Sequence, residues 1–220
     1  MPTKKLPNAD SWNSFWHMNN VPAGKPSWSK RRIMNVLDRY LQKAETALDA
    51  GCGSGFFSKY FCDKGLRTWS LDYSDDALLL AKKVTAGKAH IVKKDLLSAS
   101  MSEHIKERFD IIFSDGLLEH FTHEQRLRII SNFRALLSER GLIITFVPNK
   151  WSPWQLIRPF YMPGIEEAPM VLSELFRLHE RNGLKVVDSG GVNTFPFAFS
   201  PDRFVGRVFG MLIYTVAKRR

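Results

Sequence analysis

The sequence predicts a single α/β domain in which helices cover both faces of a mostly parallel sheet. Three observations support this fold class. Short apolar runs alternate along the chain with segments whose apolar residues recur at helical spacing. A glycine-rich turn joins the first of these runs to the first helical segment. The chain has 220 residues, of which 44% are hydrophobic, which is enough to bury one core. Such an alternation is typical of a doubly wound parallel sheet.

The apolar runs and their boundaries define the expected elements. Seven strands are predicted, at residues 47–50, 67–73, 89–94, 109–115, 142–147, 184–188 and 207–218. The clearest helix is predicted for residues 122–140, because Thr122 and Gln125 match a capping box and Gly141 is placed to end it. A further helix is expected at 169–182, ended by a glycine.

A turn with three glycines joins the first strand to the first helix. It runs from Asp49 to Gly55, with glycines at every second position from Gly51. Glycine takes positive φ readily and lets a ligand approach the backbone, since it has no Cβ. The carboxylate of Asp49 argues against a bound pyrophosphate, and the glycine spacing differs from the dinucleotide fingerprint. The turn therefore favours a ligand that carries an ammonium group.

Acidic residues also end the next strands. Asp72 ends the second strand 23 positions after Asp49, where a carboxylate can accept both hydroxyls of a ribose. Asp95 ends the third strand, where it can accept from an exocyclic amine while Leu96 and Leu97 cover a ring. We therefore expect a ribose and an amine-bearing ring along this edge of the sheet.

At this point the chain resembles the class I S-adenosylmethionine (SAM)-dependent methyltransferases, in particular the small-molecule group often called type 11. The resemblance covers about residues 46–149 and rests on five stretches in the family's order: LDAGCGSGFFS, LDYSDDAL, KKDLL, FDIIFSDGLLEHF and GLIITFVPN. It implies a Rossmann-like, mostly parallel sheet of seven strands, in which the last strand lies antiparallel between the fifth and sixth. It also implies an N-terminal helical and aromatic lid.

The resemblance further implies that SAM is the cofactor. The positions of Asp49, Gly51 and Gly53 hold the methionine part in the family. Asp72 would take the ribose hydroxyls and Asp95 the adenine amine. The complete set of predicted cofactor-binding residues is Asp49, Gly51, Cys52, Gly53, Gly55, Asp72, Tyr73, Asp95, Leu96, Ser114, Asp115 and Gly116. No metal site is predicted.

Two aromatic-rich segments lie outside the regular alternation, and they are expected to hold the substrate. They are an N-terminal lid segment, 1–45, and an insert, 151–168; the cofactor-binding core (46–150) and the C-terminal part of the sheet (169–220) complete the domain. Long stretches without a regular period are usually lids or binding loops. The alternative is that their aromatic residues only cover the open end of the core. The predicted substrate-binding residues are Trp12, Trp16, Trp151, Trp154 and Tyr161.

Methyl transfer is an in-line displacement at the carbon of a sulfonium, so the protein mainly aligns the reactants and excludes water. An oxygen or nitrogen acceptor can also need a base with a pKa near the working pH. Two histidines are candidates: His17 in the N-terminal aromatic cluster, and His120 in the Glu119-His120 pair after the fourth strand. For each, the alternative is a packed neutral histidine.

The chain is strongly basic, with a formal net charge of +10. Much of the excess lies in residues 1–45 and in the tail 218–220. Such a distribution can attract nucleic acid, an anionic membrane surface or an acidic substrate. A solvated basic face is the alternative.

Three functional hypotheses follow. The leading one is a SAM-dependent methyltransferase that modifies an O, N or C atom of a small or medium-sized, partly apolar metabolite. The second is an RNA or protein methyltransferase that uses the basic surface, although residues 114–117 lack the Asn/Asp-Pro-Pro-aromatic signature of enzymes that methylate planar amino groups in nucleic acids. The third is a cofactor-binding scaffold without catalysis.

The sequence also predicts where the protein works. There is no basic-then-apolar leader and no apolar run near the roughly 20 residues that a membrane span requires. The two cysteines, Cys52 and Cys62, form no disulfide framework or metal-ligand set. We therefore expect a cytoplasmic protein without a transmembrane segment.

Overall fold

A computed structural model describes residues 26–99, 101–161 and 167–220, and it contains a seven-stranded sheet. The strand order is β3-β2-β1-β4-β5-β7-β6. The strands are β1 (Thr46–Ala50), β2 (Arg67–Asp72), β3 (His90–Lys93), β4 (Phe109–Asp115), β5 (Leu137–Pro148), β6 (Leu184–Val192) and β7 (Leu212–Arg219). Strands β1 to β5 pair in parallel, and β7 lies antiparallel between β5 and β6. The predicted fold class is confirmed.

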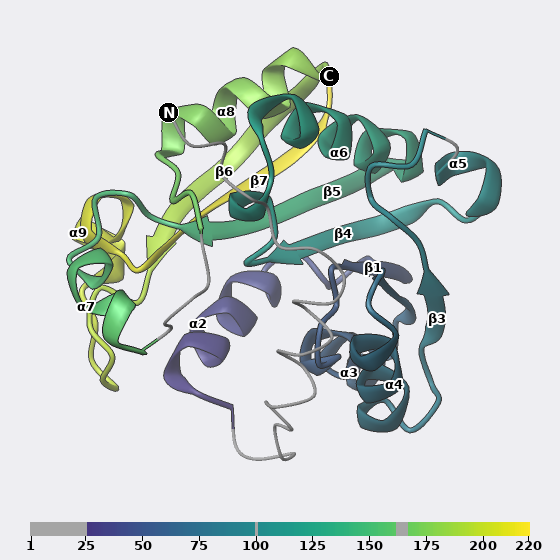
Figure 1. Ribbon diagram of the computed structural model, residues 1–220, viewed down its shortest axis with the longest axis horizontal. Helices are drawn as coiled ribbons and strands as arrows, with labels where there is room; N and C mark the ends of the chain where they lie inside the picture. Colours follow the sequence, from purple (N-terminus) through teal and green to yellow (C-terminus); the bar gives the residue numbers. More distant parts are fainter. Residues whose placement is uncertain (1–25, 100, 162–166) are drawn as a thin grey trace.

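Helices cover both faces of this sheet (Figure 1). The described helices are α2 (Trp28–Leu37), α3 (Phe56–Asp63), α4 (Asp75–Val84), α5 (Met101–His104), α6 (His123–Leu136), α7 (Trp154–Tyr161), α8 (Leu172–Arg181), α9 (Asp202–Phe209) and the 3-10 helix η1 (Leu118–His120). Helices α6 and α8 lie on one face and α2, α3 and α4 on the other (Figure 1). Within this part of the chain, no helix has the length and apolar character needed to cross a membrane.

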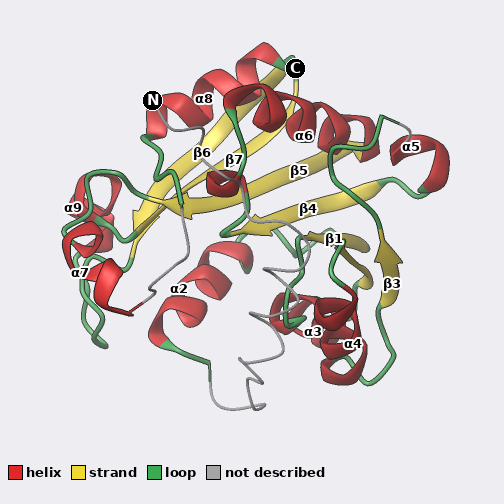
Figure 2. Cartoon of the chain, viewed as in Figure 1, coloured by secondary structure: helices red, strands yellow, loops and turns green. Residues whose placement is uncertain are grey.

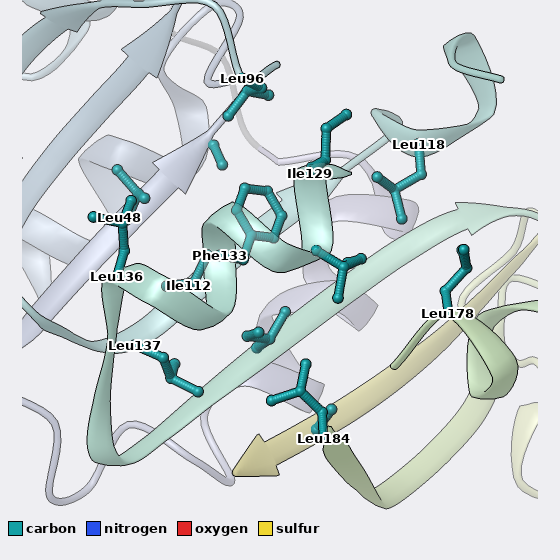
Figure 3. Close-up of a cluster of buried hydrophobic side chains, with 14 of the residues drawn as sticks. Leu48, Leu96, Ile112, Leu118, Ile129, Phe133, Leu136, Leu137, Leu178 and Leu184 are labelled. Carbon is teal, nitrogen blue, oxygen red and sulfur yellow. The ribbon is translucent and has the colours of Figure 1, made fainter. Parts of the chain in front are cut away.

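Successive residues of a strand point to opposite faces of the sheet, so their side chains pack into two separate hydrophobic cores. In β4, Ile112 faces the core under α6 and α8, whereas Ile111 and Phe113 face the core under α2 and α3. The first core includes Phe133 and Leu178 from those helices (Figure 3). Because both faces of the central strands are buried, β1 and β4 read as near-continuous apolar runs.

The predicted helix at 122–140 is correct at its start and wrong at its end. The capping box of Thr122 and Gln125 is present, but α6 ends at Leu136. Leu137 takes an extended conformation (φ −75°, ψ 135°) and pairs with Phe109 of β4. Gly141 lies within β5. A glycine is needed at this position because a Cβ would lie 2.5 Å from the Phe109 carbonyl oxygen. This glycine allows close approach of two strands and does not cap a helix.

The predicted last strand at 207–218 is also wrong at its start. Residues 202–209 form α9, and β7 begins only at Leu212 and continues to Arg219. The helix can pack here because Gly206 meets Gly191 of β6, and a Cβ on Gly206 would lie 2.2 Å from the Gly191 carbonyl oxygen. The insert after β5 likewise contains a helix, α7, where the sequence showed no clear period.

Candidate functional site

The carboxyl ends of β1, β2 and β4 meet at one edge of the sheet, because these neighbouring strands are parallel. They carry Asp49, Asp72 and Asp115. In open α/β sheets this edge, near the point where the strand order reverses, is where ligands bind. The arrowheads of β4 and β5 in Figure 2 point toward the end of the molecule that holds α2, α7 and α9.

The glycine turn has the backbone conformation that the sequence predicted. Its three glycines have positive φ values of 72°, 48° and 76° in chain order. A Cβ on Gly51 would lie 2.8 Å from Cδ1 of Leu117, so the turn packs directly on the loop after β4. A Cβ on Gly55 would lie 2.5 Å from Cα of Ala81, so this glycine allows α3 and α4 to touch. Gly55 therefore has a packing role whether or not it also approaches a ligand.

Asp72 ties the turn after β1 to the turn after β2. Its carboxylate accepts hydrogen bonds from the backbone N–H groups of Gly53 (3.0 Å), Tyr73 (2.8 Å) and Ser74 (3.0 Å). Burial raises the pKa of Asp72, and these three hydrogen bonds oppose that rise. Oδ1 accepts two of these hydrogen bonds and Oδ2 accepts one. Because each carboxylate oxygen has two acceptor sites, Oδ2 keeps one site that can accept from a ribose hydroxyl.

Asp49 is a buried carboxyl group and Asp115 a half-buried one, and the two repel each other. Burial raises the pKa of Asp49 to about 7; the hydroxyl of Ser58, which donates to its Oδ2 at 2.6 Å, lowers it, whereas the charge of Asp115 raises it further. Burial also raises the pKa of Asp115 to about 7. Near neutral pH these groups are only partly ionised, and a nearby cation would favour their charged forms.

Lys30 is a cation that the fold brings to Asp115. It lies in the first turn of α2, and its pKa is lowered by burial and raised by the charge of Asp115. Its Nζ also lies 4.0 Å from the ring centroid of Phe56, at the start of α3. The sequence indicated only an excess of basic residues in 1–45, because a single sequence does not show which strand end a lysine contacts.

The other predicted cofactor residues differ in exposure. Asp95 is exposed and accepts from the N–H of Leu97 at 2.8 Å, whereas Leu96 is buried in the core shown in Figure 3. Ser114 is buried beside Thr145, with 3.4 Å between their hydroxyl oxygens. Cys52, Tyr73 and Gly116 all lie in the turns at the same edge.

Glu119 and His120 follow β4 in η1, and both are buried. His120 Nε2 lies 4.0 Å from Glu119 Oε1, and Glu119 Oε2 has no hydrogen-bond partner within the described ranges. Burial raises the pKa of Glu119 well above its usual range. Glu119, His120 and Glu167 each offer one atom that could bind a metal ion, and these three atoms lie within 4.8 Å of one another. That no metal binds here stays a prediction from the sequence.

The predicted substrate residues are only partly placed. Trp12, Trp16 and His17 lie outside the described residues, and so does the side chain of Tyr161. Trp151 is 65% exposed, and Trp154 is half-buried at the start of α7.

Comparison with known proteins agrees with this geometry. Residues 47–141 match a family described as a methyltransferase domain. The chain is 28% identical over 167 residues to a ubiquinone biosynthesis O-methyltransferase of Nitrobacter winogradskyi, covering 68% of this chain and 60% of that protein. It is 37% identical over 102 residues to a malonyl-[acyl-carrier protein] O-methyltransferase of Hamiltonella defensa, covering 46% of this chain and 37% of that protein. The chain thus spans less than two thirds of either relative.

A solved structure shows the same fold over the whole chain. A SAM-dependent methyltransferase from Anabaena variabilis superimposes with a TM-score of 0.71 at 19% identity, covering 100% of this chain and 99% of that one. At this identity the likeness concerns the fold alone.

The buried carboxyl of Asp49 should destabilise the ligand-free protein at alkaline pH. Its folded-state pKa, about 7, lies above the usual value of 3.8, so its contribution to stability is present at acidic pH and is lost as the pH rises through 7. Asp49→Asn should therefore raise the free energy of unfolding by about 1–3 kcal/mol at pH 8 and by much less at pH 5. Urea unfolding at both pH values measures this.

Asp110 provides the matched control, since its environment lowers the pKa of its carboxyl group, whereas that of Asp49 is raised. Burial opposes ionisation there too, but hydrogen bonds from the N–H of Glu45 and the hydroxyl of Ser138 lower its pKa overall. Asp110→Asn should therefore lower stability at pH 8. Destabilisation by both substitutions would contradict our interpretation of Asp49.

Proposed function

We propose that this chain, whose residues 47–141 match a methyltransferase-domain family, uses SAM to methylate a small or medium-sized, partly apolar metabolite. The observation that carries the proposal is a pair of carboxyl groups with raised pKa values, buried Asp49 and half-buried Asp115, beside a turn of three left-handed glycines. Two curated relatives are named for O-methyl transfer in ubiquinone biosynthesis and on malonyl-[acyl-carrier protein], which favours an oxygen acceptor on a small carrier-bound or apolar molecule.

The residues present fit SAM. Its ammonium and sulfonium groups are cations, and a nearby cation stabilises the ionised forms of the Asp49 and Asp115 carboxyl groups. When bound, SAM supplies an electrophilic methyl group on sulfur. We assign its methionine part to the glycine turn with Asp49, its ribose to Asp72, and its adenine amine to Asp95. Leu96 points into the core, so we assign ring contact to its backbone and to Leu97.

His120 is our candidate base. It lies in η1 directly after the loop that carries Asp115, and Glu119 lies beside it. A base near this loop could take a proton from an acceptor hydroxyl as the new bond to carbon forms. We retain His17 as a second candidate from the N-terminal segment. The aromatic residues Trp151, Trp154 and Tyr161, together with Trp12 and Trp16, remain the proposed contacts for the apolar part of the acceptor.

We keep two alternative functions and also propose where the protein is located in the cell. An RNA or protein substrate is supported only by the charge of +10, and a scaffold without catalysis would keep the cofactor site but show no turnover. We propose a cytoplasmic location on the grounds that Cys52 and Cys62 are free thiols in the structure.

Binding of SAM and of its demethylated product, without binding of NAD, is the first test. Asp49→Asn should lower the affinity for SAM at pH 7.5 at least about tenfold, because a charge-assisted hydrogen bond is worth roughly 1.5–3 kcal/mol. Calorimetric titration measures both. Asp63→Asn is the control, since Asp63 is exposed at the C-terminal end of α3 and pairs there with Lys59. Tight binding of NAD, or an unchanged SAM affinity in Asp49→Asn, would refute the cofactor assignment.

Turnover is the second test. Incubation with SAM and a metabolite and lipid extract should produce a product heavier by one methyl group, detected by mass spectrometry. His120→Ala should slow this reaction at least about a hundredfold, the usual contribution of a general base, with little change in SAM affinity. His123→Ala, an exposed histidine on α6, should have no effect. No methylated product from any fraction, with SAM still bound, would favour the scaffold alternative.

A further inference from the structure

Several large apolar side chains are exposed to solvent at one end of the molecule. They belong to residues 151–157, 195–199 and 204–209, which we call the apolar face. Its most exposed members are Phe204 (84%), Leu156 (79%), Phe199 (78%), Phe197 (66%) and Trp151 (65%). Soluble monomers rarely expose apolar patches larger than a few hundred Å² unless the patch has a function.

Helix α9 presents its apolar side outward. Gly206 faces the sheet, where its backbone meets that of Gly191 so closely that neither could carry a Cβ. Phe204 and Val208 stand two residues on either side of Gly206, which places them on the opposite side of the helix. A surface helix normally turns its apolar stripe toward the core. In α9 the glycine side is buried and the apolar side is left in water.

The loop before α9 is held rigidly with its phenylalanines exposed. Arg32 of α2 donates to Oδ1 of Asn193 (2.9 Å) and to the carbonyl oxygens of Phe195 (2.9 Å) and Phe197. Asp202 accepts from the N–H groups of Asn193 (3.0 Å) and Thr194 (2.8 Å). These bonds fix the backbone, so the exposed side chains are presented by an ordered loop.

The segment after β5 continues the same surface. The side-chain amide of Asn149 donates to the carbonyl oxygens of Val208 (2.8 Å) and Gly210 (3.0 Å). This joins the segment that carries Trp151 to the C-terminal end of α9. Figure 1 shows α7, α9 and the loop before α9 together at one end of the molecule.

Four basic residues and one acidic residue lie within the apolar face or no more than two positions from it along the chain. The basic residues are Lys150, Arg158, Arg203 and Arg207. The acid is Asp202, which pairs with Arg32 at 3.4 Å and is 18% exposed at its side chain. Arg203, by contrast, is exposed next to Phe204. Apolar side chains flanked by cations are typical of proteins that lie on an anionic bilayer surface.

We propose that the apolar face docks on the surface of a bilayer that contains anionic lipids. The phenylalanines would enter the boundary between headgroups and acyl chains, and the neighbouring basic residues would lie among the headgroups. The chain would rest on the membrane without crossing it. The face follows β5 and β6, whose carboxyl ends lie at the same edge of the sheet as Asp49 and Asp115. Docking would thus bring this edge close to lipid. The proposal does not rest on methyl transfer.

Sedimentation with large vesicles tests it with the full chain. We expect binding to vesicles of phosphatidylcholine with 30% phosphatidylserine, little binding to phosphatidylcholine alone, and weaker binding as salt rises, since salt screens the attraction between basic residues and anionic lipids. The triple variant Phe197→Ser, Phe199→Ser, Phe204→Ser should bind at least about tenfold more weakly. Arg203→Glu should also weaken binding.

Leu79→Ser is the matched control, because Leu79 is 67% exposed on α4 and lies outside the apolar face. It should bind vesicles like the wild type. Thermal unfolding of each variant shows whether it is folded. Failure of the wild type to bind anionic vesicles, or equal binding by the triple variant, would overturn the proposal. A dimer in light scattering that is lost in the triple variant, without vesicle binding, would instead assign the face to a second copy of the chain.

Discussion

The burial of carboxyl groups at the carboxyl edge of the sheet is the constraint on which the rest of the site depends. Asp49 lies one residue before the end of β1 and is only 3% exposed, and Asp115 is close enough to raise its pKa further. A buried ionised carboxylate is costly unless a cation or several hydrogen bonds offset the loss of water. Asp49 has the Ser58 hydroxyl, and Asp115 has Lys30 nearby, and both pKa values nevertheless remain raised.

The surrounding backbone holds the turn beside these groups in place. Two of its left-handed glycines let the turn pack against Leu117 and Ala81, and Asp72 fixes the turn by accepting three backbone hydrogen bonds. The same carboxylates that weaken the ligand-free fold would strengthen the binding of a cationic cofactor. Sites of this kind commonly trade stability for function.

The sequence predicted the central fold well because local signals and burial agree there. The period of β1, β2 and β4, the glycine turn and the Thr122–Gln125 capping box all specify the observed elements. The errors lie at glycines. Gly141 resembles a helix terminator but serves strand packing, and Gly206 hides α9 inside an apolar run. Close backbone approach between distant segments leaves no periodic signal in a single sequence.

The same limit applies to the site. The acidic residues at the strand ends could be identified from spacing, since parallel strands bring their carboxyl ends together. The positions of Lys30 beside Asp115 and of Arg32 on the loop at 193–197 depend on how α2 packs against the sheet. Nothing in the sequence around Lys30 or Arg32 distinguishes them from ordinary basic residues on a protein surface. The two aromatic segments show no regular period, yet each contains a helix, α2 in 1–45 and α7 in 151–168. These helices and the apolar face could be recognised only from coordinates.

The most direct test of the buried-carboxylate account is the affinity for SAM as a function of pH, measured by calorimetry between pH 5.5 and 7.5. Binding a cation favours ionised Asp49 and Asp115, so below pH 7 it must release protons. The account predicts that affinity rises at least about tenfold over this range, as one pKa unit corresponds to a tenfold change, with protons released at the acidic end. An affinity that is constant or falls as pH rises, with no proton release, would contradict it.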